Sequence, residues 1–371
     1  MSRTYIFAGG GTGGHLYPAI AVAQQIVRLD PEAKVLFFCS NRPIDAAILS
    51  KAGYQYLPLP AKGMSLRPDL LADFVISQVK AYRVAKHRLG MVEERGIVIS
   101  VGGFASAPAV WAGRRLGFAI AMINVDLVPG KANKLLGRKA SKIFVQFEQT
   151  RAYFRGREDV VAVTGCPLRE GFNHPDRMRA IEMLGLDSKK RTLLVTGASS
   201  GSASINQSLA RILPTLEGFS QTWQVVHLTG KANFEQTKAA MPSGTIAYYP
   251  VAYYDDMPDL YAAADLLVGR AGAVSVAEYL AAGVPSVCLP YPYHKDRHQY
   301  LNAEPLVRQG AGRIVDDRPA DLQRTAEELG EQLRELMTND AQRAAMRTAA
   351  QSLARVDAAA QIAVTLRGMV G

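Results

Sequence analysis

One stretch of this 371-residue chain combines glycines, a single acid and a polar loop in an order that can bind a nucleotide sugar. Val268–Asn302 reads as a strand end, a turn of small residues, a helix that carries Glu278, a second strand and a loop. Small residues let backbone N–H groups approach an anion, and the helix start adds unpaired N–H groups and a positive dipole end. Glu278 can accept hydrogen bonds from a ribose. Sugar hydroxyls would meet the donors and acceptors of Asp296, Arg297, His298 and Gln299.

The first glycine-rich turn, GGGTGGH at residues 9–15, joins an apolar stretch to a helical pattern. It matches G-x-G-x-x-G, the pattern of dinucleotide-binding domains, which also place an acid at the end of the second strand. Here that strand ends without an acid, at residues 39–41, which argues against NAD or FAD. The turn still suits a diphosphate. His15 is either a base or phosphate ligand, or a hydrogen-bonding residue of the helix start. We assign to donor binding Thr12, Gly13 and Gly14.

Two further turns repeat this strand-to-helix arrangement, at residues 101–113 (VGGFASAPAVWAG) and 193–209 (LLVTGASSGSASINQSL). A second glycine turn of the same type favours a binding edge, although close packing of a helix on a strand also requires glycine. In the serine-rich turn, Ser199 and its neighbours can donate to a phosphate. Serine is also a good N-cap, and both roles can hold at once.

The chain has no H-E-x-x-H motif, no paired cysteines and no Asp-x-Asp that would hold a divalent ion on a diphosphate. We therefore expect a reaction that uses neither a metal ion nor a cofactor. The charge of a departing diphosphate would then be stabilised by backbone dipoles and arginine. Arg169 and Arg270 are the best-placed candidates.

Residues 70–88 form an amphipathic helical pattern in which apolar and basic side chains occur together. Such a helix can lie on an anionic membrane surface, or it can pack on a sheet like any amphipathic helix. The same half of the chain adds an apolar tryptophan and further basic residues. The residues alone favour packing on the sheet; the candidates for an acceptor and membrane contact are Phe74, Val75, Tyr82, Trp111 and Lys139.

Short apolar stretches that read as strands alternate with helical patterns throughout. They are residues 4–9, 34–40, 96–102, 119–125, 142–147 and 160–165, then 191–197, 223–230, 245–251, 265–272 and 285–291. This alternation predicts α/β domains with parallel sheets covered by helices. Pro167 breaks the series near residues 164–172. We predict two doubly wound Rossmann-like domains facing a central cleft, residues 1–163 and 164–350. A C-terminal helix, residues 351–371, is expected to pack back on the first domain.

The composition, with 48% hydrophobic and 20% charged residues, is that of a folded protein. The net charge of +10 comes from the first half, where residues 1–160 hold 22 Lys and Arg against 11 Asp and Glu. This excess suits an anionic partner, which could be nucleic acid, a membrane face or a phosphorylated substrate. Three scattered cysteines favour a reducing compartment. The N-terminus reads as a strand and not as a signal peptide, and no apolar run reaches the ~18 residues that span a bilayer.

Four segments resemble the MurG-type transferases of glycosyltransferase family 28, the UDP-N-acetylglucosamine–N-acetylmuramyl-(pentapeptide) pyrophosphoryl-undecaprenol N-acetylglucosamine transferases. These segments are GGGTGGHLYPAIAVA, GGFASAPAV, TGCPLR and GRAGAVSVAEYLAAGVPSVCLPYPYHKDRHQYLNA. The resemblance implies the two-domain GT-B architecture, with the donor on the C-terminal domain and the lipid acceptor on the N-terminal domain. It also implies inverting transfer of N-acetylglucosamine (GlcNAc) from UDP-GlcNAc to undecaprenyl-diphosphate-MurNAc-pentapeptide, the step from lipid I to lipid II in peptidoglycan synthesis.

The resemblance further implies a role for each matching residue. Glu278 would hold the ribose, Tyr254 would contact the uracil, and His15 would lie on the acceptor side. Arg169 and Ser199 would contact the diphosphate, and His298 and Gln299 would contact the sugar. Ala273 would give a backbone N–H in the turn before the acid-bearing helix.

The chain departs from this family on the acceptor side. Where the family has His-Glu-Gln-Asn, this chain has Ile123-Asn124-Val125-Asp126. Asn124 stands in place of a glutamate and cannot accept a proton at neutral pH, whereas Asp126 can. We therefore predict that the catalytic base is His15 or Asp126.

Three functions stay open at this point: the transfer just described, a related transfer to another lipid acceptor, and UDP-sugar binding without catalysis. For the enzymatic readings the expected partners are UDP-GlcNAc, a polyprenyl-diphosphate lipid acceptor and an anionic membrane surface, with no nucleic acid. The expected location is the cytoplasmic face of the inner membrane, as a peripheral protein without a transmembrane segment.

Overall fold

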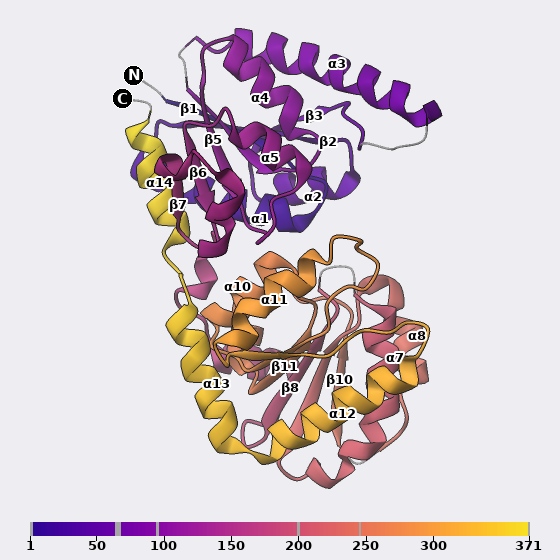
Figure 1. Ribbon diagram of the computed structural model, residues 1–371. Helices are drawn as coiled ribbons and strands as arrows, with labels where there is room; N and C mark the ends of the chain where they lie inside the picture. Colours follow the sequence, from indigo (N-terminus) through magenta and orange to yellow (C-terminus); the bar gives the residue numbers. More distant parts are fainter. Residues whose placement is uncertain (1–2, 64–67, 94–95, 199–200, 245, 370–371) are drawn as a thin grey trace. The chain divides into compact units, whose positions relative to one another are not determined.

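The computed structural model describes residues 3–63, 68–93, 96–198, 201–244 and 246–369 (Figure 1). Its contacts divide the chain into two compact units. Unit 1 comprises Met1–Arg169 and Arg355–Gly371, and unit 2 comprises Glu170–Ala354. Each unit contains a parallel sheet with helices and a hydrophobic core of its own.

The sheet of unit 1 has, in the described residues, seven parallel strands in the order β3-β2-β1-β4-β5-β6-β7. The strands are β1 Thr4–Gly9, β2 Lys34–Ser40, β3 Gln55–Leu59, β4 Ile97–Gly102, β5 Ala119–Asn124, β6 Lys142–Val145 and β7 Val161–Val163. The α-helices are α1 Gly13–Leu29, α2 Pro43–Lys51, α3 Pro68–Gly90, α4 Ser106–Arg115, α5 Lys131–Gly137 and α14 Ala358–Gly368. Short 3₁₀ helices lie at Glu148–Phe154 and Glu158–Val160.

Strands β1 and β4 are buried along their whole length and are mostly apolar, as expected for strands covered on both faces. Alternate side chains of β1 therefore enter two different cores. Ile6 packs in a cluster on one face, and Tyr5 and Phe7 pack in a cluster on the other. The second cluster also contains Ile362 and Leu366 of α14, so the C-terminal helix is part of unit 1.

The sheet of unit 2 has, over the same described residues, six parallel strands in the order β10-β9-β8-β11-β12-β13. The strands are β8 Arg191–Thr196, β9 Trp223–Leu228, β10 Ala247–Val251, β11 Leu266–Gly269, β12 Ser286–Cys288 and β13 Gly312–Ile314. The α-helices are α6 Arg177–Leu184, α7 Ala203–Ile212, α8 Phe234–Ala240, α9 Met257–Ala263, α10 Ala273–Ala281, α11 His298–Arg308, α12 Leu322–Thr338 and α13 Asp340–Leu353. Short 3₁₀ helices lie at Glu170–Phe172, Leu213–Phe219 and Lys231–Asn233.

In both sheets the strand order reverses at one point, between β1 and β4 in unit 1 and between β8 and β11 in unit 2. Doubly wound sheets bind ligands at such a point, beyond the carboxyl ends of the strands. The two glycine-rich turns follow β1 and β4, the serine-rich turn follows β8, and the turn with Arg270 follows β11. The topology therefore brings the predicted chemistry of each unit to its own binding edge.

The prediction of two doubly wound α/β domains with parallel sheets is confirmed. The sequence patterns missed β3 and β13, which are edge strands. Strand β3 contains Pro58 and is mostly accessible, and β13 has only three residues, one of them Arg313. Edge strands need not be apolar on both faces, so they lack the continuous hydrophobic run of a central strand. In the described parts of the chain, no helix is both long and apolar enough to cross a membrane.

Candidate functional site

In unit 1 the two glycine-rich turns lie backbone against backbone. The Gly10 N–H donates to the Gly102 carbonyl oxygen at 3.3 Å. A Cβ at Gly9 would lie 2.3 Å from that same oxygen, and a Cβ at Gly103 would lie 2.5 Å from the Gly10 oxygen. Glycine is therefore required at Gly9 and Gly103 by the close approach of the two turns.

His15 lies in the first turn of α1 with its ring against Gly102, and it is half-buried. Its Nδ1 is 3.2 Å from the Gly10 carbonyl oxygen and 3.2 Å from Thr12 Oγ1. A carbonyl oxygen can only accept, so Nδ1 carries the proton and Nε2 carries the lone pair of the neutral ring. Burial lowers the pKa of His15, against the opposing effects of the Asp126 carboxylate and the Gly10 carbonyl. His15 is therefore a neutral imidazole whose Nε2 can take a proton.

The loop after β5 carries Asp126 and is held by Asn124. The Asn124 side chain is buried; its Nδ2 donates to the Asp126 backbone oxygen at 2.6 Å, and its Oδ1 accepts from Asn133 Nδ2 at 2.9 Å. Asn124 thus acts on the backbone and shapes the loop. The half-buried Asp126 is close enough for its charge to raise the pKa of His15. The structure therefore places the two predicted base candidates within electrostatic reach of each other.

A carboxylate that the sequence patterns did not single out anchors the first glycine turn. Asp45, in the first turn of α2, is 0% exposed. Its two oxygens accept from the Gly11 N–H at 2.9 and 2.8 Å, and Oδ2 also accepts from the Ser40 N–H at 3.0 Å and from Ser40 Oγ at 2.7 Å. Arg42 Nη1 donates to the Gly11 oxygen at 2.8 Å. The acid near the end of β2 therefore binds the turn itself. Its position just after the strand beside β1 was the available signal.

The remaining predicted residues of unit 1 lie on its surface or beside α1. Thr12 is the N-cap of α1, and Gly13 and Gly14 are its first helical residues. The Arg169 guanidinium lies over the Tyr17 ring of α1, 5.1 Å from its centroid.

Helix α3 runs along α4 and buries the face with Ala81 and Ala85 (Figure 1). Val75 is 51% exposed and Trp111 of α4 is 44% exposed, whereas Tyr82 packs partly on the core and Phe74 is half-buried. Lys139, after α5, is exposed. A row with four-residue spacing runs along the outer face of α3, and all of its members are exposed: Leu71, Val75, Val79 and Arg83.

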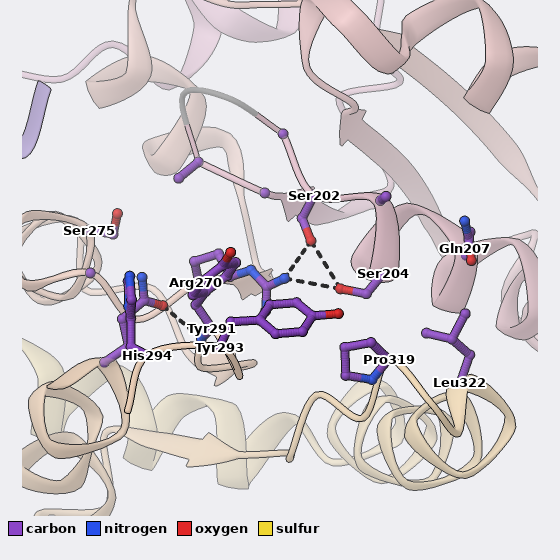
Figure 2. Close-up of a pocket in the computed structure, with 16 residues that line it drawn as sticks. Ser202, Ser204, Gln207, Arg270, Ser275, Tyr291, Tyr293, His294, Pro319 and Leu322 are labelled. Carbon is purple, nitrogen blue, oxygen red and sulfur yellow. Dashed lines mark hydrogen bonds between the residues drawn. The ribbon is translucent and has the colours of Figure 1, made fainter. Parts of the chain in front are cut away.

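Unit 2 contains a cavity of about 610 Å³ at its binding edge (Figure 2). Two helix starts face it, because Ser202 caps α7 and Gly272 caps α10. Unpaired N–H groups at helix starts favour an anion. The lining residues are Gly197, Ala198, Gly201, Ser202, Ala203, Ser204, Gln207, Arg270, Gly272, Ser275, Tyr291, Tyr293, His294, Gln299, Pro319 and Leu322.

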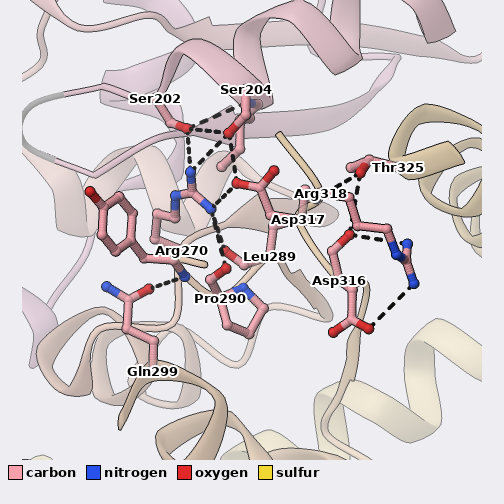
Figure 3. A network of polar contacts seen from close by, with 12 residues as sticks. Ser202, Ser204, Arg270, Leu289, Pro290, Gln299, Asp316, Asp317, Arg318 and Thr325 are labelled. Atoms are coloured by element: carbon pink, nitrogen blue, oxygen red, sulfur yellow. Dashed lines mark hydrogen bonds and ion pairs between the residues drawn. The ribbon is translucent and has the colours of Figure 1, made fainter. Parts of the chain in front are cut away.

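Arg270 forms the floor of this cavity and belongs to a buried polar network (Figure 3). Its Nη1 donates to Asp317 Oδ2 at 2.7 Å and to the Leu289 oxygen at 2.9 Å. Its Nη2 donates to Ser202 Oγ at 2.6 Å and to Ser204 Oγ at 3.0 Å. The guanidinium therefore fixes the serine-rich turn. Its predicted contact with a diphosphate stays a prediction.

The other predicted donor residues of unit 2 lie on or near the same edge. Gln299 lines the cavity, and its Oε1 accepts from the Tyr291 N–H at 2.9 Å and from the Ala271 N–H at 3.3 Å. Glu278, one turn into α10, accepts from Tyr261 Oη at 3.3 Å, and Ala273 is the first residue of that helix.

Several predicted donor residues lie outside the cavity lining or the described structure. His298 Nδ1 is 2.8 Å from Asp296 Oδ1, and Tyr254 Oη lies 3.9 Å from Met183 Sδ. The cavity lining includes none of Tyr254, Ala273, Glu278 and His298. Ser199 is not among the described residues.

The sequence patterns did not assign several residues that build the cavity: Ser204, Gln207, Tyr291 and Asp317. Asp317 follows the missed strand β13, so the signal for it was lost together with that strand. Over the described ranges, no group of three or more His, Cys, Asp or Glu side chains is arranged to hold a metal ion.

Comparison with known proteins places this architecture in one family. A model described as the glycosyltransferase family 28 N-terminal domain matches residues 5–145, and the family 28 C-terminal domain matches residues 192–362. A UDP-N-acetylglucosamine–N-acetylmuramyl-(pentapeptide) pyrophosphoryl-undecaprenol N-acetylglucosamine transferase of Geobacter sulfurreducens is 36% identical over 368 residues, which cover 96% of both chains. The protein of the same name from Geobacter metallireducens is 35% identical over 95% of both. The crystal structure of Acinetobacter baumannii MurG superposes with a TM-score of 0.76 at 25% identity, over 99% of this chain and 100% of that one.

Proposed function

The chain belongs to glycosyltransferase family 28, and from this premise we propose that it transfers GlcNAc from UDP-GlcNAc to undecaprenyl-diphosphate-MurNAc-pentapeptide. The proposed reaction inverts the anomeric carbon, needs no metal ion and converts lipid I into lipid II in peptidoglycan synthesis. The observation that carries the proposal is the identity of 36% to a transferase of that name along 96% of both chains.

The binding edge of unit 2 supports the donor part of the proposal. The starts of α7 and α10 face one cavity, and together they offer the unpaired N–H groups that a diphosphate needs. These dipoles are held in place before the reaction, so they can stabilise the charge that develops on the departing UDP. Glu278, further along α10, is the residue we assign to the ribose.

The unit 1 edge supports the chemical step. An acceptor hydroxyl oxygen attacks the anomeric carbon, the new C–O bond forms, and the bond from that carbon to the diphosphate oxygen breaks. The electron pair leaves with UDP, and the hydroxyl proton passes to the base. His15 fits this role because its ring is neutral and its Nε2 lone pair is unprotonated. Asp126 is the other candidate, and its charge would also stabilise a protonated His15.

The loop after β5 favours a second candidate function, transfer from the same donor to a different lipid acceptor. Asn124 is a buried amide that holds this loop, where a glutamate of the family would carry a negative charge. A neutral amide at this place changes the electrostatics that an acceptor meets.

A transfer assay with radiolabelled UDP-GlcNAc tests the proposal. The purified protein is incubated with lipid I in detergent, with a diacylglycerol acceptor, or with no acceptor, and label in the lipid fraction is measured beside release of UDP. Label in lipid II supports the main proposal, and label only in the diacylglycerol arm supports the second candidate. Donor binding by calorimetry without UDP release in any arm would leave a UDP-sugar-binding protein and refute both transfer proposals.

We also propose that the outer face of α3 rests on the anionic, cytoplasmic surface of the inner membrane, which would make this a peripheral protein. Exposed Val75 and Val79 share one row with the basic Arg83, so apolar insertion and charge attraction act on the same face. Val75→Asp combined with Val79→Asp should reduce co-sedimentation with vesicles of anionic phospholipid at least about tenfold. Val364→Asp, at an exposed position of α14, is the matched control. Equal loss of binding in both variants would refute the proposed surface.

A further inference from the structure

We propose that Asp45 is a positioning residue for the catalytic step, because it fixes the Gly10–Gly11 peptide so that its carbonyl group holds the Nδ1 proton of His15. Asp45 does not itself meet the substrate edge, since it is fully buried under the first glycine turn. The kinetic part of this inference rests on the proposed function. The structural part does not.

The hydrogen bonds around Asp45 hold the first glycine turn in place. Both carboxylate oxygens face the Gly11 N–H, and Oδ2 also accepts from the backbone and the hydroxyl of Ser40. These partners are all donors, which is what an ionised carboxylate requires when water is excluded. A Cβ at Gly10 would lie 2.3 Å from Asp45 Oδ2, so the turn is packed directly on the carboxylate.

One peptide group connects Asp45 to His15. The Gly11 N–H that Asp45 binds and the Gly10 carbonyl that His15 Nδ1 contacts belong to the same planar, trans peptide. In a trans peptide the N–H and the C=O point in opposite directions. An anchor on the N–H side therefore dictates where the carbonyl oxygen points, and here it points at the histidine ring.

This peptide needs an anchor because glycine lies on both sides of it. Gly10 and Gly11 have φ angles of 137° and 94°, and glycine moves between such conformations more freely than any other residue. If the peptide rotated, Nδ1 would lose its carbonyl acceptor. The proton could then move to Nε2, and the Nε2 lone pair would disappear.

Charged groups from several elements act on this histidine. Asp45 from α2 and Asp126 from the loop after β5 both raise the pKa of His15, while burial lowers it more. Arg42, just before α2, donates to the Gly11 oxygen and so holds the far side of the turn. Loss of the Asp45 charge should therefore lower the pKa of His15 further, which a general loss of stability would not do.

The kinetic test is Asp45→Asn, which keeps the shape and removes the charge. We expect kcat to fall at least about tenfold while the Kd for UDP-GlcNAc changes less than about twofold, the pattern of a lost transition-state contribution. The acid limb of the kcat profile should move to lower pH. Asp30→Asn, which removes a partly buried acid that pairs with Arg3 in the same unit, should leave all three quantities unchanged. A wild-type kcat and pH profile for Asp45→Asn would refute the inference.

A second measurement does not depend on activity. Long-range ¹H–¹⁵N NMR spectra of histidine-labelled protein, assigned with His15→Gln, report which ring nitrogen of His15 is protonated. We expect the Nδ1–H form in the wild type and a mixture, or the Nε2–H form, in Asp45→Asn. If the wild-type enzyme transfers no sugar, this spectrum still decides the structural part, and an unchanged tautomer would refute it.

A milder variant, in which Asp45 loses one hydrogen-bond donor, provides a test if Asp45→Asn does not fold. Ser40→Ala deletes the hydroxyl that donates to Asp45 at 2.7 Å and leaves the carboxylate in place. We expect a smaller change in the same direction, both in kcat and in the His15 spectrum. If Asp45→Asn does not fold, a Ser40→Ala protein with a wild-type spectrum and kcat would count against the inference.

Discussion

The buried ion pair between Arg270 and Asp317 gives the sharpest test of how unit 2 is held together. The side chains are 8% and 0% exposed, so solvent screening does little to weaken the pair. Asp317→Asn keeps the volume and removes the negative charge, which leaves the Arg270 guanidinium buried without its counter-ion.

The expected size of the effect follows from the remaining partners of Arg270. Breaking a buried pair by removing one partner costs roughly 3–5 kcal/mol. Arg270 keeps the Leu289 carbonyl and the hydroxyls of Ser202 and Ser204, which still stabilise the cation. We therefore expect the lower end, a loss of about 3 kcal/mol in the free energy of unfolding of unit 2. With a urea m-value of about 2 kcal/mol per molar, the midpoint should fall by about 1.5 M.

Urea denaturation followed by Trp223 fluorescence measures this loss. Trp223 is fully buried in unit 2, and the exposed Trp111 of unit 1 can be replaced by phenylalanine in all variants. The matched control is Asp316→Asn, which removes the neighbouring carboxylate, 55% exposed and 3.3 Å from Arg318. That change should cost less than about 0.5 kcal/mol. Equal midpoints for the Asp317 and Asp316 variants would show that the buried pair does not stabilise unit 2.

Four further predictions concern individual residues. Glu278→Ala should weaken UDP-GlcNAc binding by about 1–3 kcal/mol, because a ribose hydroxyl would lose its partner; unchanged affinity in calorimetry would contradict the assignment. His15→Ala or Asp126→Asn should lower kcat much more than donor affinity, and wild-type turnover in both would exclude both as the base. Because burial lowers the pKa of His15, kcat should fall on acidification through a limb that lies at lower pH than that of an ordinary histidine. Finally, burial lowers the pKa of His227 to about 3. Between these pH values the unfolded chain therefore binds a proton at His227 that the folded chain does not bind. The free energy of unfolding should fall as the pH drops from about 6.5 toward 3, by at most about 1.4 kcal/mol per pH unit. Urea midpoints at pH 7 and 5 check this, and an equal drop in His227→Gln would assign the effect elsewhere.

Much of the fold could be predicted from the sequence because its signals are local. Central strands such as β1 and β4 are mostly apolar runs, and glycine-rich turns follow directly after them. Strands β3 and β13 gave no such signal, because an edge strand is buried less and can contain Pro58 or Arg313.

The candidate site could be predicted only in part, for the same reason. The turns around Gly9, Gly102 and Gly272 could be predicted because clustered glycines indicate a tight backbone turn between a strand and a helix. Asp45 and Asp317 were missed because each acts on a turn that is distant in the chain, Gly11 and Arg270 respectively. In both cases the partner is brought to the acid by strand order and not by nearness in the sequence.

The sequence by itself determined two α/β domains, the type of their binding turns and the family. Apolar strand segments, glycine-rich turns and motif spacing are all patterns of residues that lie close together in the chain. Tertiary structure alone decided which side chains hold those turns. Adjacency of β2 to β1 brings Asp45 under the first glycine turn, and adjacency of β12 to β11 and β13 brings Asp317 to Arg270. A parallel sheet places neighbours in space that lie far apart along the chain, so the anchors of the site belong to the fold and not to any motif.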